Sequence, residues 1–573
     1  MPQGATLRLT YRLTLGRQFR QPSRYAFVAR WGAEDLEMKD FSGLALGKHP
    51  NWRLRVIGTI LIVFLTRVTV CPAETVPTTA TTAPHAPMVL AHCQRLSPEL
   101  TILAALMKDP SQAKDQCLPI IVERNGDATV LPVRLIRPLI GPYVLAMATG
   151  KEIDALAGSA NVRYAEMGGS VCTIQEATRR MEAAVESPGQ WGDQREPLVG
   201  IVDQTICREL FSEGGSQRIL AVATEPSGAS APQPSVHGSV MAKVIAATSP
   251  HARYALMQGP MDKLHIISAV GDCYRLAQRD HRNCVVNISA NTTVGPHDGT
   301  SIFEKILARY AQAGLWIVVS AGNTGDSSRH AQFTRDDCHQ GRVCLPWSLG
   351  TNSRGIAEAV VDLWFDTSLP CNVSLAMPGG RVFQDVATGG GAVWAINGGF
   401  VAVANGLSDP ANGQTNVMVI VKCFLREEEQ TGDWSLLVTP QKDQPFTAHA
   451  WMNCGAGNGG QFTAHVSQNV TVSPPATCQA VISVGGYDLK QGRKVYLSQG
   501  PTRDGRTCPD LTLASPFGTS YAAARVTGLL AESLYRDPNV PADKWELIGR
   551  ILPNRQTNGD DSPTAEPSAG VLR

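Results

Sequence analysis

The segment around Ser520 carries residues suited to nucleophilic catalysis. Gly518, Thr519 and Ser520 run directly into an alanine-rich stretch, 521–528, which predicts a helix with Ser520 at its start. Backbone N–H groups at a helix N-terminus lack intrahelical partners and favour negative charge, as a developing oxyanion requires. A serine that merely caps a helix is equally ordinary, so other segments must decide between the two roles.

Three more polar side chains stand where strands end or helices begin. Asp203 follows the apolar run 198–202, which is typical of a strand buried on both faces. His237 begins a predicted helix, and Asn323 closely follows another apolar run. Ligand sites of open α/β sheets lie beyond the carboxyl ends of strands, so these residues are candidates for one site. Taken singly, each also fits a structural role, the aspartate as a cap and the histidine as a packing residue.

The four residue types together suit acyl transfer. A serine hydroxyl is a poor nucleophile at neutral pH and needs an adjacent base, for which histidine titrates in the right range. A carboxylate can fix the imidazole tautomer and stabilise the imidazolium that forms. An amide side chain beside the serine N–H can complete an oxyanion hole.

At these positions the chain resembles the subtilisin-like serine peptidases, or subtilases, whose catalytic residues follow the order Asp, His, Ser. The resemblance covers about 197–350 and 475–545. The segments that carry it are 200–203, 237–239, 318–323, 498–506 and 518–523. Segments 287–289 and 295–301 are similar to a bacterial branch that carries a jelly-roll insertion between the oxyanion asparagine and the serine.

The resemblance implies roles for individual residues. Ser520 would be the nucleophile, His237 the base, Asp203 its partner and Asn323 an oxyanion donor. It further implies protein or peptide substrates, and an N-terminal prodomain that chaperones folding and blocks the cleft. The substrate backbone would pair with three residues in a row: Ser289, Ala290 and Asn291.

Several positions depart from the family pattern. Gln204 and Thr205 follow the aspartate, Val240 replaces a second histidine, and Ala524 stands where proline is usual. The substrate-pairing segment, 289–292, also differs. A second interpretation therefore stays open, a catalytically impaired subtilase-like binding protein that uses the inserted sheets for recognition. A serine esterase is disfavoured because Ser520 lacks the Gly-x-Ser-x-Gly pattern.

The elements that must position these residues form an α/β fold. Strands are expected at 119–123, 143–147 and 161–166 with a helix at 151–156, which makes a small α+β unit. An amphipathic helix at 174–186 and a polar linker should follow. From residue 197 apolar runs alternate with helices, which predicts a parallel sheet flanked by helices. The apolar runs in this alternation are 198–202, 264–270, 284–289 and 315–320, and the helices are 235–247 and 299–313.

The rhythm changes between 352 and 472. Short strand-like runs separated by Gly-, Pro- and Asn-rich turns predict an inserted β-sandwich. The runs are 359–364, 372–375, 392–396, 400–403, 417–421, 434–438, 447–451 and 462–466. The parallel pattern then resumes at 480–484.

These patterns divide the chain into six parts. They are a leader (1–73), a prodomain-like unit with linkers (74–190), the catalytic domain in two parts (197–350 and 475–552), the inserted β-sandwich (352–472) and a polar tail (553–573). The first of the linkers is a Pro/Thr-rich stretch at 74–90.

The leader contains a basic tripeptide, 53–55, followed by the apolar run 56–65. This suits a secretory signal and predicts a secreted or periplasmic protein. An uncleaved signal-anchor, a start at Met38 and a lipid on Cys71 are the alternatives.

Composition excludes some classes of function. The net charge of +1 offers no global field for nucleic acid or membranes. The 14 cysteines include no Cys-x-x-Cys pair, which argues against a structural zinc module. Cys338 and Cys344 are the best candidates for a disulfide if the protein is exported, and buried free thiols are the alternative. No cofactor is expected and no metal ligand is assigned; calcium stays open as an alternative, although no motif for it can be assigned.

Overall fold

The computed structural model describes most of the chain from residue 87 onward. The described residues are 87–91, 95–107, 116–126, 130–169, 172–173, 193, 195–211, 218–224, 236–406, 409–426, 429, 432–455, 457–490, 493–515 and 517–552. The expected leader, the helix at 174–186 and the polar tail lie outside them. The described residues all lie within one compact unit, Thr82–Arg573. Among the described residues, no helix is long and apolar enough to cross a membrane.

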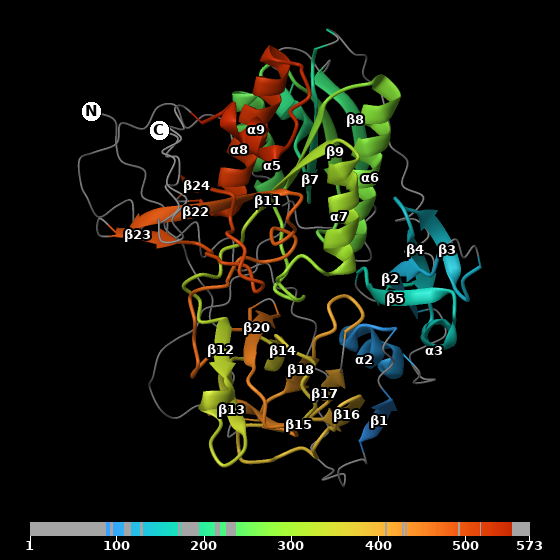
Figure 1. Cartoon of the computed structure of the whole chain (residues 1–573), viewed down its shortest axis with the longest axis vertical. Helices are drawn as coiled ribbons and strands as arrows, with labels where there is room; N and C mark the ends of the chain where they lie inside the picture. The colour runs from blue at the N-terminus through green and yellow to red at the C-terminus, as the bar shows by residue number, and fades with distance from the viewer. Residues whose placement is uncertain are drawn as a thin grey trace, which may run out of the picture. The chain divides into compact units, whose positions relative to one another are not determined.

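The parallel sheet expected from residue 197 is present (Figure 1). Its strand order is β23-β22-β11-β10-β7-β9-β8, with β24 beside β22. Every described pair is parallel except β22–β23. The strands are β7 (Leu198–Asp203), β8 (Ile219–Thr224), β9 (Arg253–Gln258), β10 (Cys284–Ile288), β11 (Leu315–Ser320), β22 (Ile482–Lys490), β23 (Arg493–Tyr496) and β24 (Leu511–Ala514).

Helices cover both faces of this sheet (Figure 1). Helices α5 (Val236–Thr248), α8 (Thr519–Arg536) and α9 (Lys544–Gly549) share one apolar core with it. Helices α6 (Lys263–Asp280) and α7 (Ile302–Gln312) share the other. This covering on both sides explains why the strands are continuously apolar.

One apolar run has a different structure from that which the alternation suggested. Residues 264–270 begin helix α6, and the strand at this point of the sheet is β9. Asp262 caps the helix by accepting a hydrogen bond from His265 N at 2.9 Å. The run is helical because this cap starts a turn just before it.

Residues 330–462 form two antiparallel sheets and are here called the two-sheet region; β1 (Met88–Ala91) adds an edge strand to one of the sheets. One sheet has the order β1-β16-β17-β18-β14-β20-β12 and the other β15-β19-β13-β21. The strands after β1 are β12 (His330–Thr334), β13 (Val343–Leu349), β14 (Ile356–Phe365), β15 (Cys371–Ala376), β16 (Gly390–Ile396), β17 (Gly399–Gly406), β18 (Asn416–Phe424), β19 (Trp434–Pro440), β20 (Thr447–Cys454) and β21 (Gly460–Phe462).

Seven of the eight strand-like runs expected here coincide with strands, and the eighth, 462–466, only touches β21. Two strands were not expected. β12 pairs with β20, and β13 pairs with β19, so both belong to these sheets although they precede residue 352.

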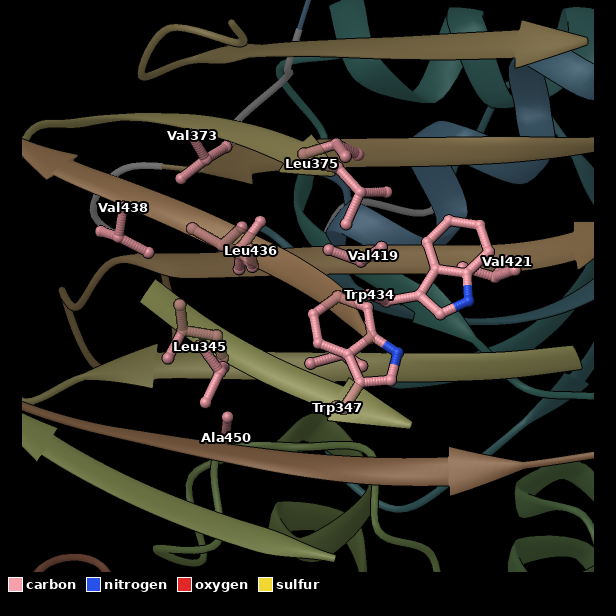
Figure 2. Close-up of a cluster of buried hydrophobic side chains, with 14 of the residues drawn as sticks. Leu345, Trp347, Val373, Leu375, Val419, Val421, Trp434, Leu436, Val438 and Ala450 are labelled. Atoms are coloured by element: carbon pink, nitrogen blue, oxygen red, sulfur yellow. The ribbon is translucent and has the colours of Figure 1, made fainter. Parts of the chain in front are cut away.

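Side chains from both sheets form one core (Figure 2). Trp347 of β13 and Trp434 of β19 lie nearly parallel, with ring centroids 6.5 Å apart. Both are fully buried. Val419 and Val421 from β18 of the other sheet join the same cluster. Burial of these inward faces is the main stabilisation available to such a pair of sheets.

The described residues between 95 and 173, here called the N-terminal unit, include a sheet and the helices α2 and α3. Its sheet has the order β3-β4-β2-β5, with β6 beside β2, and its own core joins helices and strands. The elements are α2 (Pro98–Leu106), β2 (Gln116–Arg124), β3 (Arg134–Pro138), β4 (Tyr143–Ala148), α3 (Gly150–Gly158), β5 (Val162–Met167) and β6 (Cys172–Thr173). Strands β2, β4 and β5 and helix α3 lie where the sequence predicts the three strands and the helix of a small α+β unit.

The N-terminal unit contacts the other two parts. Ile121 and Leu145 of its sheet share a core with helices α6 and α7. Ile102 of α2 packs with Ala402 and Met418 of the two-sheet region. In addition, β1 (Met88–Ala91), expected as the end of a linker, pairs antiparallel with β16 at the sheet edge.

The three parts meet at a small cavity of about 40 Å³. Its lining is rich in ionisable groups, and Lys263 Nζ lies 3.5 Å from Glu166 Oε1. The Tyr164 hydroxyl donates to Asp409 at 3.0 Å, which links the N-terminal unit to the two-sheet region. The other ionisable residues lining it are Glu99 and Asp362.

The suggested disulfide between Cys338 and Cys344 is absent, since both thiols are free. Cys344 lies on β13 between buried Val343 and Leu345 and is exposed, because alternate side chains point to opposite faces. Cys338 packs against the core of the two-sheet region instead.

Candidate active site

Asp203 and His237 form a hydrogen-bonded pair. Asp203 ends β7 and His237 lies in the first turn of α5. His237 Nδ1 is 2.9 Å from Asp203 Oδ2 and 3.0 Å from Oδ1, and Gln204 N donates to Oδ1 at 2.8 Å. The hydrogen bond to Asp203 raises the pKa of His237, against a smaller opposing effect of burial. Because a carboxylate only accepts, Nδ1 carries the proton and Nε2 is left as the basic nitrogen.

Ser520 lies in the first turn of α8, after Gly518, whose φ of 93° favours glycine. Its hydroxyl donates to the backbone carbonyl of Ser289 at 3.3 Å. Within the described ranges, no hydrogen bond joins the Ser520 hydroxyl to the His237 ring. The hydroxyl therefore rests against the strand end rather than on the imidazole.

Close contact of α5 with α8 sets the relative position of His237 and Ser520. A Cβ atom on Gly528 would lie 1.9 Å from Thr248 Oγ1 and 2.8 Å from Ile245 O, so only glycine fits there. Ile245 and Gly528 stand about two helical turns beyond His237 and Ser520 respectively. The contact between α5 and α8 thus lies about two turns from His237 on one helix and about two turns from Ser520 on the other. Both helices begin at the carboxyl edge of the sheet.

Asn323 lies beside the start of α8. Its Oδ1 accepts from Thr519 N at 2.9 Å and from Thr519 Oγ1 at 3.1 Å. Thr519 also exchanges hydrogen bonds with Gly322, accepting from its N–H at 3.1 Å. Because these contacts occupy the oxygen of the amide, the exposed side chain keeps its NH₂ group for another acceptor.

The expected substrate-pairing segment follows β10. Ser289 is buried and its hydroxyl donates to the carbonyl of Ser520 at 3.4 Å. Ala290 is partly buried, and Asn291 is exposed. The structure therefore brings the segment next to Ser520.

Sequence reasoning missed three residues that support this site. Thr519 holds Asn323, while Asn287 and Thr527 hydrogen-bond one another at 3.1 Å beneath Ser289. The adjacency of Thr519 to Ser520 was a usable signal for the first. No local pattern links residues 287 and 527. Among the described residues, no group of three or more His, Cys, Asp or Glu side chains could hold a metal ion.

Comparison with known proteins gives one family match. The subtilase family model matches residues 382–565, which include Ser520 but neither Asp203 nor His237. No curated protein matches the chain.

The chain is also similar to solved structures. The chain is similar to the CspB protease of Clostridium perfringens, with a TM-score of 0.51 and 19% identity over 65% of this chain and 91% of that one. At this identity the likeness concerns the fold. An S41 psychrophilic protease gives a TM-score of only 0.29 at 10% identity, over 62% of this chain and 82% of that one. The match to the subtilase family is thus confined to residues 382–565, and the likeness to the CspB protease shows a shared fold.

Proposed function

We propose that the chain is an endopeptidase that hydrolyses peptide bonds in proteins through Asp203, His237 and Ser520. The observation that carries this proposal is the 2.9 Å contact between Asp203 and His237. His237 lies on α5, which packs against α8, and Ser520 lies in the first turn of α8. A carboxylate-held imidazole beside a serine at a helix N-terminus has the chemistry of acyl transfer.

In the first half of the reaction, Ser520 Oγ attacks the carbonyl carbon while His237 Nε2 takes the hydroxyl proton. The negative charge moves to the carbonyl oxygen, where the Asn323 NH₂ group and the Ser520 N–H would donate to it. The C–N bond then breaks, and the proton on His237 passes to the departing amine. Asp203 stabilises the intermediate imidazolium.

In the second half, water attacks the acyl-enzyme ester. His237 takes a proton from the water and returns it to Ser520 Oγ as the ester bond breaks. A carboxylic acid leaves, and the enzyme regains its initial state.

Substrate would bind as an extended strand along Ser289, Ala290 and Asn291. The Ser520 hydroxyl now donates to Ser289 O at 3.3 Å. A substrate N–H that takes this carbonyl would free the hydroxyl to turn toward His237, so binding and activation of the nucleophile are coupled in this proposal.

The other parts are assigned by position. The two-sheet region would be an insertion in the catalytic domain, and the N-terminal unit would be a prodomain. Its contact with helices α6 and α7 supports that assignment. The basic and apolar segment at 53–65 supports export to the periplasm or the medium.

The test is labelling by a fluorophosphonate, which reacts with activated serines. Wild-type protein should label and should degrade casein, while Ser520→Ala should do neither. Ser533→Ala is the control, because the Ser533 hydroxyl bonds to Leu530 O within helix α8, far along the helix from Ser520. Equal labelling of wild type and Ser520→Ala would defeat the assignment. A folded protein that neither labels nor degrades casein would indicate the impaired binding protein instead.

A further inference from the structure

A buried amide interrupts the apolar interior of the parallel sheet. Asn287 is fully buried on β10, between Ile201 of β7 and Val318 of β11. Burying an amide without hydrogen bonds costs on the order of 1–3 kcal/mol. A side chain with this cost, at the strand that leads to Ser289, needs compensating partners.

Asn287 has a partner on each side of its amide. Its Nδ2 donates to Ser289 Oγ at 2.9 Å, and its Oδ1 accepts from Thr527 Oγ1 at 3.1 Å. Thr527 is fully buried too, and its hydroxyl also lies 2.9 Å from Ala523 O in its own helix. The three side chains form one chain of contacts from α8 to the end of β10.

This chain returns to the nucleophile. Ser289 contacts Ser520 twice, through its hydroxyl to the Ser520 carbonyl at 3.4 Å and through its carbonyl to the Ser520 hydroxyl at 3.3 Å. Ser520 and Thr527 stand about two turns apart on the same face of α8. The end of β10 therefore contacts helix α8 at two separate points. These contacts fix both the position of α8 along its axis and its rotation about that axis.

We propose that Asn287 and Thr527 are positioning residues for peptide hydrolysis. This inference rests on the proposed function, because it concerns the placement of Ser520 and of the substrate-pairing Ser289. Asn287 and Thr527 hold Ser289 and the first turns of α8 in one arrangement. A misplacement of about 1 Å at a reacting group can cost about 100-fold in rate.

The experiment compares Thr527→Val, which removes the hydroxyl at nearly constant volume, with Thr527→Ser, which keeps it. Peptide hydrolysis and fluorophosphonate labelling are measured for both, with the thermal midpoint of unfolding. Thr527→Val should lower kcat by about 10-fold or more with a smaller change in KM, and Thr527→Ser should recover most of the loss. Ser533→Ala in the same helix should match wild type.

Asn287→Leu extends the test to the other member of the pair. Combined with Thr527→Val, it should lower kcat no further than the more severe single variant, because either change breaks the same chain of contacts. If Asn287→Leu does not fold, the comparison of Thr527→Val with Thr527→Ser still tests the positioning role. Wild-type kcat in folded Thr527→Val would overturn the inference while leaving the peptidase assignment intact. Absence of labelling in wild type would overturn both.

Discussion

His237 Nδ1 lies 2.9 Å from Asp203 Oδ2, and the aspartate side chain is only 2% exposed. The imidazole is therefore bound at one nitrogen by a carboxylate that water hardly reaches. The other nitrogen points away from this partner. This relationship gives His237 a fixed tautomer before any substrate arrives.

The first prediction concerns the acid limb of the pH profile. The base is neutral His237, so kcat/KM should rise with pH through the pKa of His237, which the bond to Asp203 holds above its usual 6.5. Asp203→Asn removes the cause of that shift, so the limb should move to lower pH. The Asp203→Asn substitution should also lower kcat by about 10,000-fold, as the equivalent change does in a Ser-His-Asp triad.

Labelling rate against pH measures this limb even where turnover is slow. Asp443→Asn is a suitable control, because Asp443 is an exposed carboxylate paired with Arg335 on the surface. An identical acid limb in wild type and Asp203→Asn would contradict the role of the pair.

The second prediction separates two functions of Asn323. Asn323→Asp keeps an oxygen for Thr519 N and Oγ1 but loses the NH₂ group. We expect kcat to fall by about 100- to 1,000-fold, with KM and the thermal midpoint little changed. Steady-state kinetics with a peptide substrate measure this. Retained activity in the aspartate variant would mean that the amide does not donate to the oxyanion.

The third prediction concerns the contact between α5 and α8. Gly528→Ala places a methyl group 1.9 Å from Thr248 Oγ1, so the helices must separate. Overpacking of this kind costs about 1–3 kcal/mol of unfolding free energy, and the shift should also lower kcat. Calorimetry and peptide hydrolysis measure the two effects. Gly549→Ala is the matched control, because a Cβ there meets nothing within 4 Å. Equal stability of the two variants would contradict the close crossing.

The fourth prediction concerns the cavity where the three parts meet. Burial raises the pKa of Glu99 to about 7 and that of Asp409 to about 6. A carboxyl group with a raised pKa contributes stability below its unfolded pKa, near 4.5 for Glu99, and loses it as pH rises through about 7. The contribution of Glu99 to the urea midpoint of the full chain should therefore fall between pH 4.5 and 7.

Glu99→Gln should flatten this fall, because glutamine stays neutral at every pH. Glu358→Gln, on the surface beside Lys422, should leave the slope unchanged. The comparison of each variant with wild type isolates Glu99 from other titrating groups. An unchanged slope in Glu99→Gln would show that this carboxyl group does not govern the junction.

Strong local patterns predicted much of the fold. The apolar run that became β7 is buried throughout, and the helix expected at 299–313 is α7, 302–312. The run at 264–270 was ambiguous because apolar residues at 264, 266, 267 and 270 fit either period, and the cap at Asp262 decides for a helix. Strand β13 was missed because Pro346 interrupts it.

Long-range contacts set the limit of sequence reasoning. Strand β1 lies where the sequence predicts a linker, because its only described strand partner, β16, lies some three hundred residues further along the chain. The candidate residues Asp203 and His237 could be found from strand ends and helix starts. The link between Asn287 and Thr527 could not, because it depends on how α8 lies across β10.

The contacts that β1 and the N-terminal unit make with the rest of the chain determine what a cleavage between β6 and β7 would produce. Strand β1 is hydrogen-bonded into the edge of one sheet, α2 packs on the same sheet, and β2 packs on helices of another part. A nick there would leave two polypeptides still bound as one particle. Release of the N-terminal fragment would require the contacts of β1, α2 and β2 to break and their surfaces to become exposed to solvent. Cleavage of the backbone and dissociation of the fragment are therefore distinct events with distinct rates.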